Sequence, residues 1–267
     1  MTGFFHRKFV SVLFSAFFVL LLCGQAEITW AADHILIVHA DSGSAPMSDL
    51  MASGLFDSVD EFDAEGATPV LGDLTSYDAV LAYTNSTPAD QSALGNVLAD
   101  YVDGGGHLVI CTYSFSTPWE ITGRIMTAGY APLTNLGTNG EVSGNLSAVV
   151  PADPIFSGID LGSVSYFHNN NFAHPGLDAG ATLLATDGAG INMIARNSSG
   201  NIYGVNLFPE TGENNQEIFD LIANMLDEGQ SRPTAAIPTM TEWGMMLFAL
   251  MLGSAVIFHM RKRNTVA

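Results

Sequence analysis

One strand–helix–strand run in the middle of the 267-residue chain constrains the fold more than any other feature. The apolar runs AVLAYT (79–84) and HLVICTY (107–113) are typical of strands that are buried on both faces, as in parallel sheets. Five apolar side chains recur between them at helical spacing: Leu94, Val97, Leu98, Tyr101 and Val102. A helix that joins two neighbouring strands in this way makes a right-handed parallel crossover, so the run predicts an α/β fold.

The residues around this apolar stripe carry the signals for both ends of the helix. Thr87 fits the N-cap position, Pro88 fits the first helical position, and Asp90 completes a capping box. Three glycines at 104–106 favour a helix end. The pattern therefore predicts a helix that begins at Pro88 and ends just before these glycines.

Further strand and helix patterns lie on either side of this run. ILIVHA (35–40) is another apolar run that predicts a buried strand. It is followed by a predicted helix over 49–59 and a second predicted strand near 67–71. Short strands are predicted at 145–150 and 164–169.

The last part of this region predicts antiparallel strands and a closing helix. Residues 181–209 are typical of a three-stranded meander, with a turn at 198–200. The closing helix carries a second apolar stripe: Ile218, Leu221, Ile222, Met225 and Leu226. Together the patterns predict one α/β domain over residues 33–228, with a flavodoxin-like, mostly parallel sheet and an antiparallel addition.

The amino-terminal end has the pattern of a secretory signal peptide, which we predict to cover residues 1–32. Arg7 and Lys8 precede a continuous apolar run over 9–22. Small residues allow cleavage after Ala26 or after Ala31. If Cys23 is removed with the signal, Cys111 is the one remaining cysteine, and a lone cysteine makes no internal disulfide.

The carboxyl-terminal end has the pattern of a single membrane span. GQSRPTAA (229–236) is typical of a linker. Residues 243–260 form an apolar run of about the length that a transmembrane helix needs. A basic cluster follows it: Arg261, Lys262 and Arg263. Because basic residues stay on the cytoplasmic side, the large domain is predicted to lie on the periplasmic or extracellular side.

The motif at the start of this segment, IPTMTEWG (237–244), resembles the bacterial IPTL-CTERM sorting signal, a relative of the PEP-CTERM signals of Gram-negative bacteria. The matching positions are Ile237, Pro238, Thr239, Glu242, Trp243 and Gly244, and Met240 stands where that signal has Leu. The resemblance implies that residues 237–267 insert into the inner membrane and are then recognised and processed by an exosortase-type membrane peptidase. The alternative is an ordinary tail anchor.

The charge of the central region limits the class of partner. Residues 33–236 contain three Arg, no Lys and 25 acids, which gives a formal charge of −22. Such a region repels nucleic acid and anionic membranes at long range. It suits cations, neutral ligands or basic partners, and it also serves solubility outside the cell.

A series of phrases in the central region resembles the class I glutamine amidotransferase-like superfamily, more narrowly its ThuA-like and related non-amidotransferase branch. The phrases are, in order, YDAVLAYT, DYVDGGGHLVI, ADPIFSGI and GVNLFPE, and the resemblance covers most of residues 34–228. It implies that active relatives use a Cys in a Gly-x-Cys-x-Gly elbow as nucleophile. It also implies a His base in a phrase like GVQFHPE, with the Glu of that phrase orienting the His.

Compared with that pattern, this chain has a degenerate site. Cys111 falls at the nucleophile position, but Val109 and Tyr113 stand where the two glycines are expected. Phe208 takes the place of the His, and Glu210 matches the acid. Because Phe cannot accept a proton, Cys111 has no base, so we predict no catalytic residue here and interpret Cys111 as a packed apolar side chain.

Four polar residues are predicted to gather at the carboxyl ends of adjacent strands: Asp41, Asn85, Tyr113 and Glu210. Open α/β sheets have their ligand clefts at this edge, so it is the predicted ligand cleft. The loop 41–46 could bind phosphate in such a fold, but the negative field opposes an anion there.

No metal site and no cofactor is predicted. His168 and His174 flank the segment 169–173, and five acids lie between Asp57 and Glu65. The histidines have no recognised metal-site spacing and the acids do not match an EF-hand loop, so both groups are interpreted as surface side chains.

These features predict an exported cell-envelope protein with a non-catalytic amidotransferase-like domain and an exosortase-type signal. The sorting resemblance suggests matrix polysaccharide as a partner. The alternative is a secreted hydrolase or isomerase that uses the same cleft with other groups, such as Glu210 and a histidine.

Overall fold

The computed structural model describes residues 34–167, 172–209, 211, 212 and 214–228. The predicted signal peptide, linker, sorting motif and transmembrane helix lie outside these residues, as do His168 and Glu210. In the residues that are described, no helix is long and apolar enough to cross a membrane.

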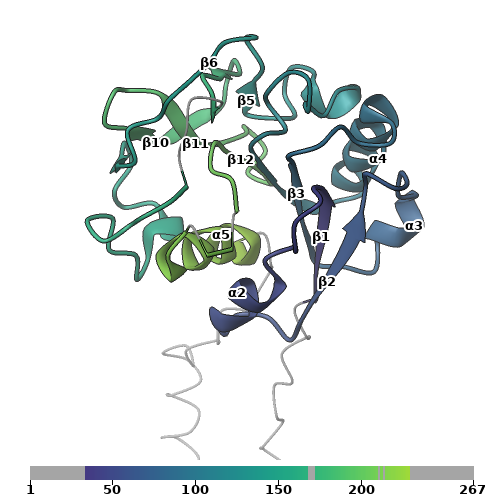
Figure 1. The fold of residues 1–267 in the computed structure, drawn as a ribbon, viewed down its shortest axis with the longest axis horizontal. Coiled ribbons are helices and arrows are strands. Elements are labelled where there is room, and N and C mark those ends of the chain that lie inside the picture. Colours follow the sequence, from purple (N-terminus) through teal and green to yellow (C-terminus); the bar gives the residue numbers. More distant parts are fainter. Residues whose placement is uncertain (1–33, 168–171, 210, 213, 229–267) are drawn as a thin grey trace, which may run out of the picture. The chain divides into compact units, whose positions relative to one another are not determined.

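One eight-stranded sheet forms the centre of the domain (Figure 1). Its strands, in their order across the sheet, are β2 (Ser58–Asp63), β1 (His34–Ala40), β3 (Ala79–Thr84), β4 (His107–Cys111), β12 (Ile202–Val205), β11 (Asn192–Arg196), β10 (Thr182–Asp187) and β7 (Leu146–Ala148). The pairs from β2 to β12 are parallel, and the pairs from β12 to β7 are antiparallel. This arrangement confirms the predicted parallel sheet with an antiparallel addition.

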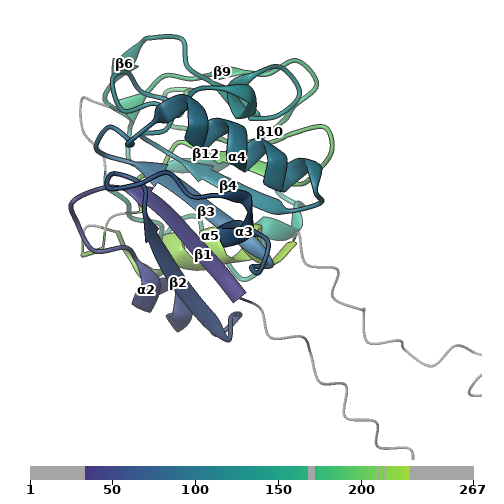
Figure 2. The ribbon, with the colours of Figure 1, turned by 90° about the vertical axis from the view of Figure 1, so that its right-hand side faces the viewer.

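Helices cover both faces of the parallel strands. Figure 2 shows α4 (Gln91–Asp103) on one side of the strands, and α5 (Gln216–Glu228) and α2 (Met47–Ala52) on the other. The short helix α3 (Leu71–Leu74) packs beside α4. The two predicted apolar stripes are confirmed, because every one of their side chains is buried in α4 or α5. Each strand therefore contributes alternate residues to two separate apolar layers.

The chain between β4 and β10 is mostly irregular. It contains two short 3₁₀ helices, η1 (Arg124–Met126) and η2 (Pro154–Phe156). It also contains two short antiparallel pairs: β5 (Leu133–Thr134) with β9 (Gly176–Leu177), and β6 (Asn139–Gly140) with β8 (Phe172–Ala173). The strand predicted at 164–169 is wrong for residues 164–167, which form no strand, and residues 168 and 169 lie outside the described part.

The start of α4 differs from the prediction. The N-cap is Asp90, whose Oδ1 accepts hydrogen bonds from the amides of Ser92 and Ala93 at 3.0 and 2.9 Å. The helix does not begin at Pro88 because the backbone of Asp90 is extended (φ −147°, ψ 103°), and the Ala89 amide before it donates to the carbonyl of Ala64 at 2.8 Å.

The predicted position of the second strand is also wrong. The predicted helix over 49–59 ends at Ala52, and Gly54 follows with a φ of 72°, a conformation that stops a helix. The strand is β2 at Ser58–Asp63, whereas the segment predicted as a strand near 67–71 leads into α3. Since β2 is an edge strand with three acids, it lacks the apolar run that marks a buried strand.

Candidate functional site

The predicted cleft lies where the strand order reverses. The chain passes from β1 to β2 on one side and then returns to β3 on the other side of β1. Asp41 follows β1 and Asn85 follows β3, and Asn85 Nδ2 donates to Asp41 Oδ1 at 3.2 Å. Two of the four predicted cleft residues therefore meet at the point where open α/β sheets hold ligands.

Tyr113 lies at the same sheet edge but in the interior. Its amide donates to the carbonyl of Thr84 at 2.7 Å, which ties the chain after β4 to the end of β3. Its side chain is only 3% exposed, and its ring lies 5.5 Å from the rings of both Trp119 and Phe172. The fourth predicted residue, Glu210, lies outside the described residues.

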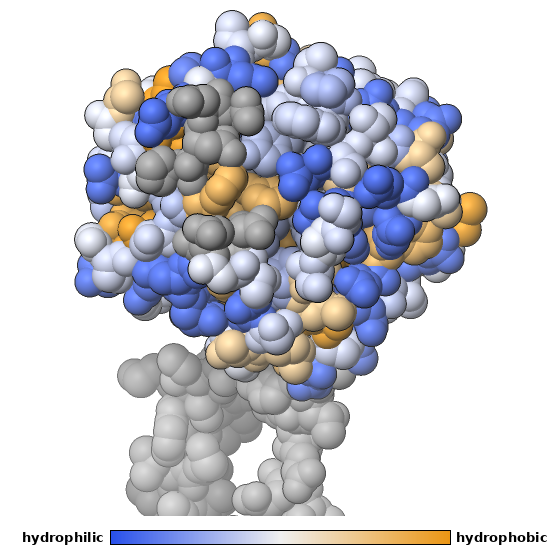
Figure 3. Space-filling view, viewed as in Figure 1, coloured by the Kyte–Doolittle hydropathy of each residue, from blue (hydrophilic) through white to orange (hydrophobic). Residues whose placement is uncertain are grey.

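Phe208 belongs to the same group of rings. It is 2% exposed, and its ring lies 5.4 Å from Tyr113, 5.7 Å from Tyr83 and 6.1 Å from Phe167. We call Tyr83, Tyr113, Phe167, Phe172 and Phe208 the aromatic cluster. Figure 3 shows a small apolar area near the middle of the face that is turned to the viewer, with polar side chains to its right. The position where the resemblance implies a catalytic base thus belongs to packed aromatic rings.

Cys111, the last residue of β4, is fully buried. It lies in the apolar layer under α5, together with Val109. Burial raises the pKa of the Cys111 thiol far above its usual range, because a thiolate in this layer would lose its hydration. The thiolate is the reactive form of cysteine, so this environment keeps the sulfur in its unreactive form.

The buried histidines are engaged with other groups. His39 is 5% exposed; its Nε2 lies 3.6 Å from Glu61 Oε2, and its ring stacks on Tyr83 at 5.6 Å. His107 Nε2 donates to the carbonyl of Met225 at 2.7 Å, which fixes its tautomer. Burial lowers the pKa of His107, because the imidazolium would be poorly solvated there.

The candidate metal ligands form no cluster in the described ranges, where no group of three His, Cys, Asp or Glu side chains could hold a metal ion. Of the acids from Asp57 to Glu65, Asp57 comes just before β2, Asp60, Glu61 and Asp63 lie on it, and Glu65 lies in the turn after it. Asp63 Oδ1 there accepts from the amides of Glu65 and Gly66 at 2.9 and 3.3 Å. His174 lies in the chain between β8 and β9, and its ring packs against Gly140 of β6.

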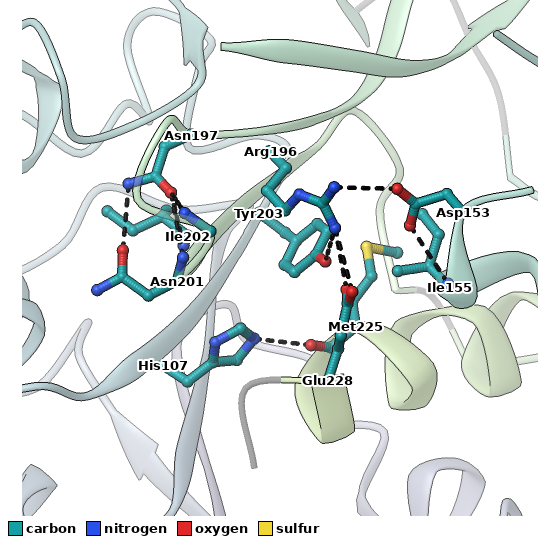
Figure 4. Close-up of polar contacts among 11 residues, drawn as sticks. His107, Asp153, Ile155, Arg196, Asn197, Asn201, Ile202, Tyr203, Met225 and Glu228 are labelled. Atoms are coloured by element: carbon teal, nitrogen blue, oxygen red, sulfur yellow. Dashed lines mark hydrogen bonds and ion pairs between the residues drawn. The ribbon is translucent and has the colours of Figure 1, made fainter. Parts of the chain in front are cut away.

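A cluster of polar side chains around Arg196 lies at the opposite end of the sheet (Figure 4). Arg196 Nη2 lies 3.1 Å from Asp153 Oδ2, and its Nη1 lies 3.1 Å from Glu228 Oε1 and donates to Tyr203 OH at 3.0 Å. The Arg196 side chain therefore joins β11 and β12 to η2 and to the end of α5. Asp153 belongs to the phrase ADPIFSGI, so this part of the family resemblance has a structural use.

A second concave site lies outside the predicted cleft. A pocket of about 440 Å³ lies between the chain after β4 and the chain after β5. Its lining includes Thr117, Glu120, Met126 and Asn135. No periodic pattern or motif marks these residues, and the one available signal was an acid, Glu120, two positions after a proline.

Solved structures share the fold of the domain. A glutamine amidotransferase from Methylobacillus flagellatus matches with a TM-score of 0.50 and 8% identity, over 76% of this chain and 97% of that one. A cytoplasmic protein from Salmonella typhimurium matches with a TM-score of 0.50 and 13% identity, over 73% of this chain and 98% of that one. A ThuA-like protein from Bacteroides uniformis has a TM-score of 0.47 and 12% identity, over 78% of this chain and 96% of that one.

These likenesses show the fold alone. The glutamine amidotransferase-like fold predicted for the central domain is confirmed, and the narrower ThuA-like branch stays a prediction. No family model and no curated protein matches the chain.

Proposed function

We propose that the chain is an exported cell-envelope protein whose glutamine amidotransferase-like domain binds a partner and does not catalyse a reaction. The targeting part of the proposal comes from the two ends of the sequence, which lie outside the described residues. The non-catalytic part comes from the domain itself, and the contact between Phe208 and Tyr113 carries it.

Thiol-dependent amide hydrolysis needs a thiolate nucleophile, a base and access for the substrate, and the residues at this site oppose all three. The nucleophile must become a thiolate, but burial raises the pKa of Cys111. A base must accept the thiol proton, but the ring of Phe208 occupies the base position and packs on Tyr113 at 5.4 Å. The substrate must reach the sulfur, but Cys111 is fully buried. All three observations support a domain that has kept the fold without the chemistry.

The charge distribution supports a neutral or cationic partner. The described ranges contain two basic side chains, Arg124 and Arg196. Arg124 pairs with Asp100 and Asp103, and Arg196 pairs with Asp153 and Glu228. Neither is available for an anionic ligand, so we propose neutral envelope polysaccharide as the large partner of the mature protein.

The two ends of the chain would bring the protein to the cell envelope. In this proposal a signal peptide exports the chain, and the helix 243–260 holds it in the inner membrane until an exosortase-type peptidase recognises residues 237–244. Processing then attaches or releases the acidic domain on the outer side of that membrane.

The absence of amidase chemistry is tested by ammonia release from glutamine. We expect no release above background from the wild-type chain or from Cys111→Ala, with a glutaminase as positive control. Release by the wild type that Cys111→Ala abolishes would refute the proposal.

One observation favours the alternative, a hydrolase or isomerase. His39 has a carboxylate partner in Glu61 at 3.6 Å, and a His–carboxylate pair can act as a general base. A panel of ester, lactone and sugar-isomer substrates separates the two proposals. Turnover by the wild type that is lost in His39→Gln would establish the enzyme, and we expect none.

A further inference from the structure

The pocket of about 440 Å³ beside α4 is a second site that the degenerate amidotransferase site does not include. One wall comes from the chain after β4, and the other comes from the chain at the end of β5 and after it. The lining residues are Thr117, Glu120, Ile121, Thr122, Gly123 and Met126 in the first wall and Thr134, Asn135 and Gly137 in the second. Small-molecule sites have volumes of roughly 300–1,000 Å³, so the pocket has room for a small organic ligand but is much larger than a metal ion.

The first wall is fixed to α4. Gln91 Nε2 donates to the carbonyls of Pro118 and Glu120 at 2.8 and 2.7 Å, and the Thr122 amide donates to the Gln91 carbonyl at 3.1 Å. Gly95 lets the backbone of Thr122 lie directly on the helix, because a Cβ at Gly95 would overlap the Thr122 carbonyl oxygen. This wall therefore needs no ligand to take its shape.

The second wall is fixed by strand pairing and by a contact with the first wall. Thr134 pairs with Gly176 between β5 and β9. Asn135 Nδ2 donates to Thr117 Oγ1 at 3.2 Å, and Asn135 Oδ1 accepts from the Gly137 amide at 2.7 Å. The Asn135–Thr117 bond joins the two walls, so the pocket is preformed.

One carboxylate oxygen in the lining of the pocket lacks a hydrogen-bond donor in the described part of the chain. Glu120 Oε2 is buried and has no hydrogen-bond partner among the residues that the structure describes. Among the described residues that line the pocket none is basic, and the nearby Arg124 pairs with Asp100 and Asp103 instead. The Glu120 side chain as a whole is half-buried, and this oxygen is free to accept a hydrogen bond, so a ligand that brings N–H groups to Glu120 gains a charge-assisted hydrogen bond.

We propose that this pocket binds the primary ammonium group of a small organic cation, with Glu120 as its counter-ion. The hydroxyls of Thr122 and Thr134 accept the remaining ammonium protons, and Met126 covers the carbon chain of the ligand. The formal charge of −22 over residues 33–236 adds a long-range attraction for a cation that a neutral sugar does not have. This site goes beyond the proposed function, which assigns no small ligand.

The test is isothermal titration of the full-length chain in neutral detergent. The probe is n-pentylammonium, and the matched probes are 1-pentanol, which has no charge, and tetramethylammonium, which has no N–H donor. We expect saturable binding of n-pentylammonium and at least about tenfold weaker binding of the two matched probes, which corresponds to about 1.4 kcal/mol.

Two acid variants separate the pocket from the general field. Glu120→Gln should weaken n-pentylammonium binding about tenfold or more, whereas Glu65→Gln, the same charge change on an exposed turn, should change it less than about twofold. Thr134→Val, which replaces one hydroxyl with a methyl group, is the second variant to measure in case Glu120→Gln does not fold. It should weaken binding about threefold.

Three results would overturn the proposal: no saturable binding of n-pentylammonium, equal effects of the two acid variants, or tighter binding of glucose than of the ammonium probe. Each of these results leaves the ammonia-release test unchanged, so failure of this proposal is distinguishable from failure of the proposed function.

Discussion

The ring of Phe208 lies 5.4 Å from the ring of Tyr113, and neither side chain is more than 3% exposed. Phe208 stands where the family resemblance implies a histidine base, and Tyr113 stands where it implies an elbow glycine. The two residues that depart from the pattern therefore pack against each other. A single reversal does not restore the site, because the remaining aromatic ring still occupies it.

Phe208→His tests this mutual packing. We expect no ammonia release from glutamine, and we expect a loss of about 2–5 kcal/mol in the free energy of unfolding, because a polar ring enters an apolar cluster. Urea denaturation measures the loss, and Phe208→Leu is the control, with a loss of about 1 kcal/mol. Gain of glutamine-dependent ammonia release that Cys111→Ala then removes would contradict the expectation.

The burial of Cys111 predicts slow labelling of its thiol. In a Cys23→Ser background, which leaves Cys111 as the one cysteine, iodoacetamide at pH 8 should modify the native chain at least about 100-fold more slowly than the urea-unfolded chain. Mass spectrometry follows the reaction. Equal rates in the two states would show that the sulfur is accessible in the native protein.

His107 predicts a loss of stability at mildly acidic pH. Burial lowers its folded-state pKa below the value of about 6.5 in the unfolded chain, so the unfolded chain binds a proton first as the pH falls. The contribution of His107 is therefore complete above about pH 6.5 and decreases below it, by at most about 1.4 kcal/mol per pH unit.

Denaturation of the wild type and His107→Gln between pH 8 and 5 measures this effect. Glutamine can still donate to the Met225 carbonyl but does not titrate, so the wild type should lose stability relative to the variant below pH 6.5. Other titrating groups, among them Glu228 with its raised pKa, are present in both proteins and cancel in the difference. Parallel pH profiles would rule out the assigned role of His107.

Gly95→Ala tests the contact between α4 and the first wall of the pocket. Its Cβ would overlap the backbone of Thr122, so we expect a net loss of about 1–3 kcal/mol in the free energy of unfolding. Gly72→Ala is the matched control, because Gly72 also lies in a helix and a Cβ there meets nothing within 4 Å. The control should gain up to about 1 kcal/mol from helix propensity. Equal effects of the two substitutions would mean that the wall moves freely.

Periodic patterns made the core elements predictable from sequence. The stripes of α4 and α5 are buried as predicted, since each helix must turn one apolar face to the sheet. The strand β2 was missed because an edge strand with acids at Asp60, Glu61 and Asp63 has no need of an apolar run.

The two candidate sites also differ in how far the sequence predicts them. The contact between Asp41 and Asn85 could be predicted, because topology alone brings the ends of β1 and β3 together. The pocket at Glu120 could not, because two irregular segments form it and their positions depend on tertiary contacts such as Gly95 with Thr122.

The tail, residues 237–267, is predicted to act as a sorting signal that depends on particular side chains. A plain anchor needs only apolar length and flanking charge, whereas a sorting enzyme must also read side chains at the membrane surface. We therefore expect Pro238→Ala with Trp243→Ala to leave membrane insertion intact and to block processing, because Pro238 stiffens the approach and Trp243 fixes the depth of the motif.

Immunoblots of fractions from the native host should show a longer, membrane-bound form of the double variant, whereas the wild type loses the end that carries Arg261 and migrates faster. A strain without its exosortase-type gene is the control, and in it the wild type should match the double variant. If wild type and double variant have the same size and location in the native host, the tail is only an anchor and the sorting proposal fails.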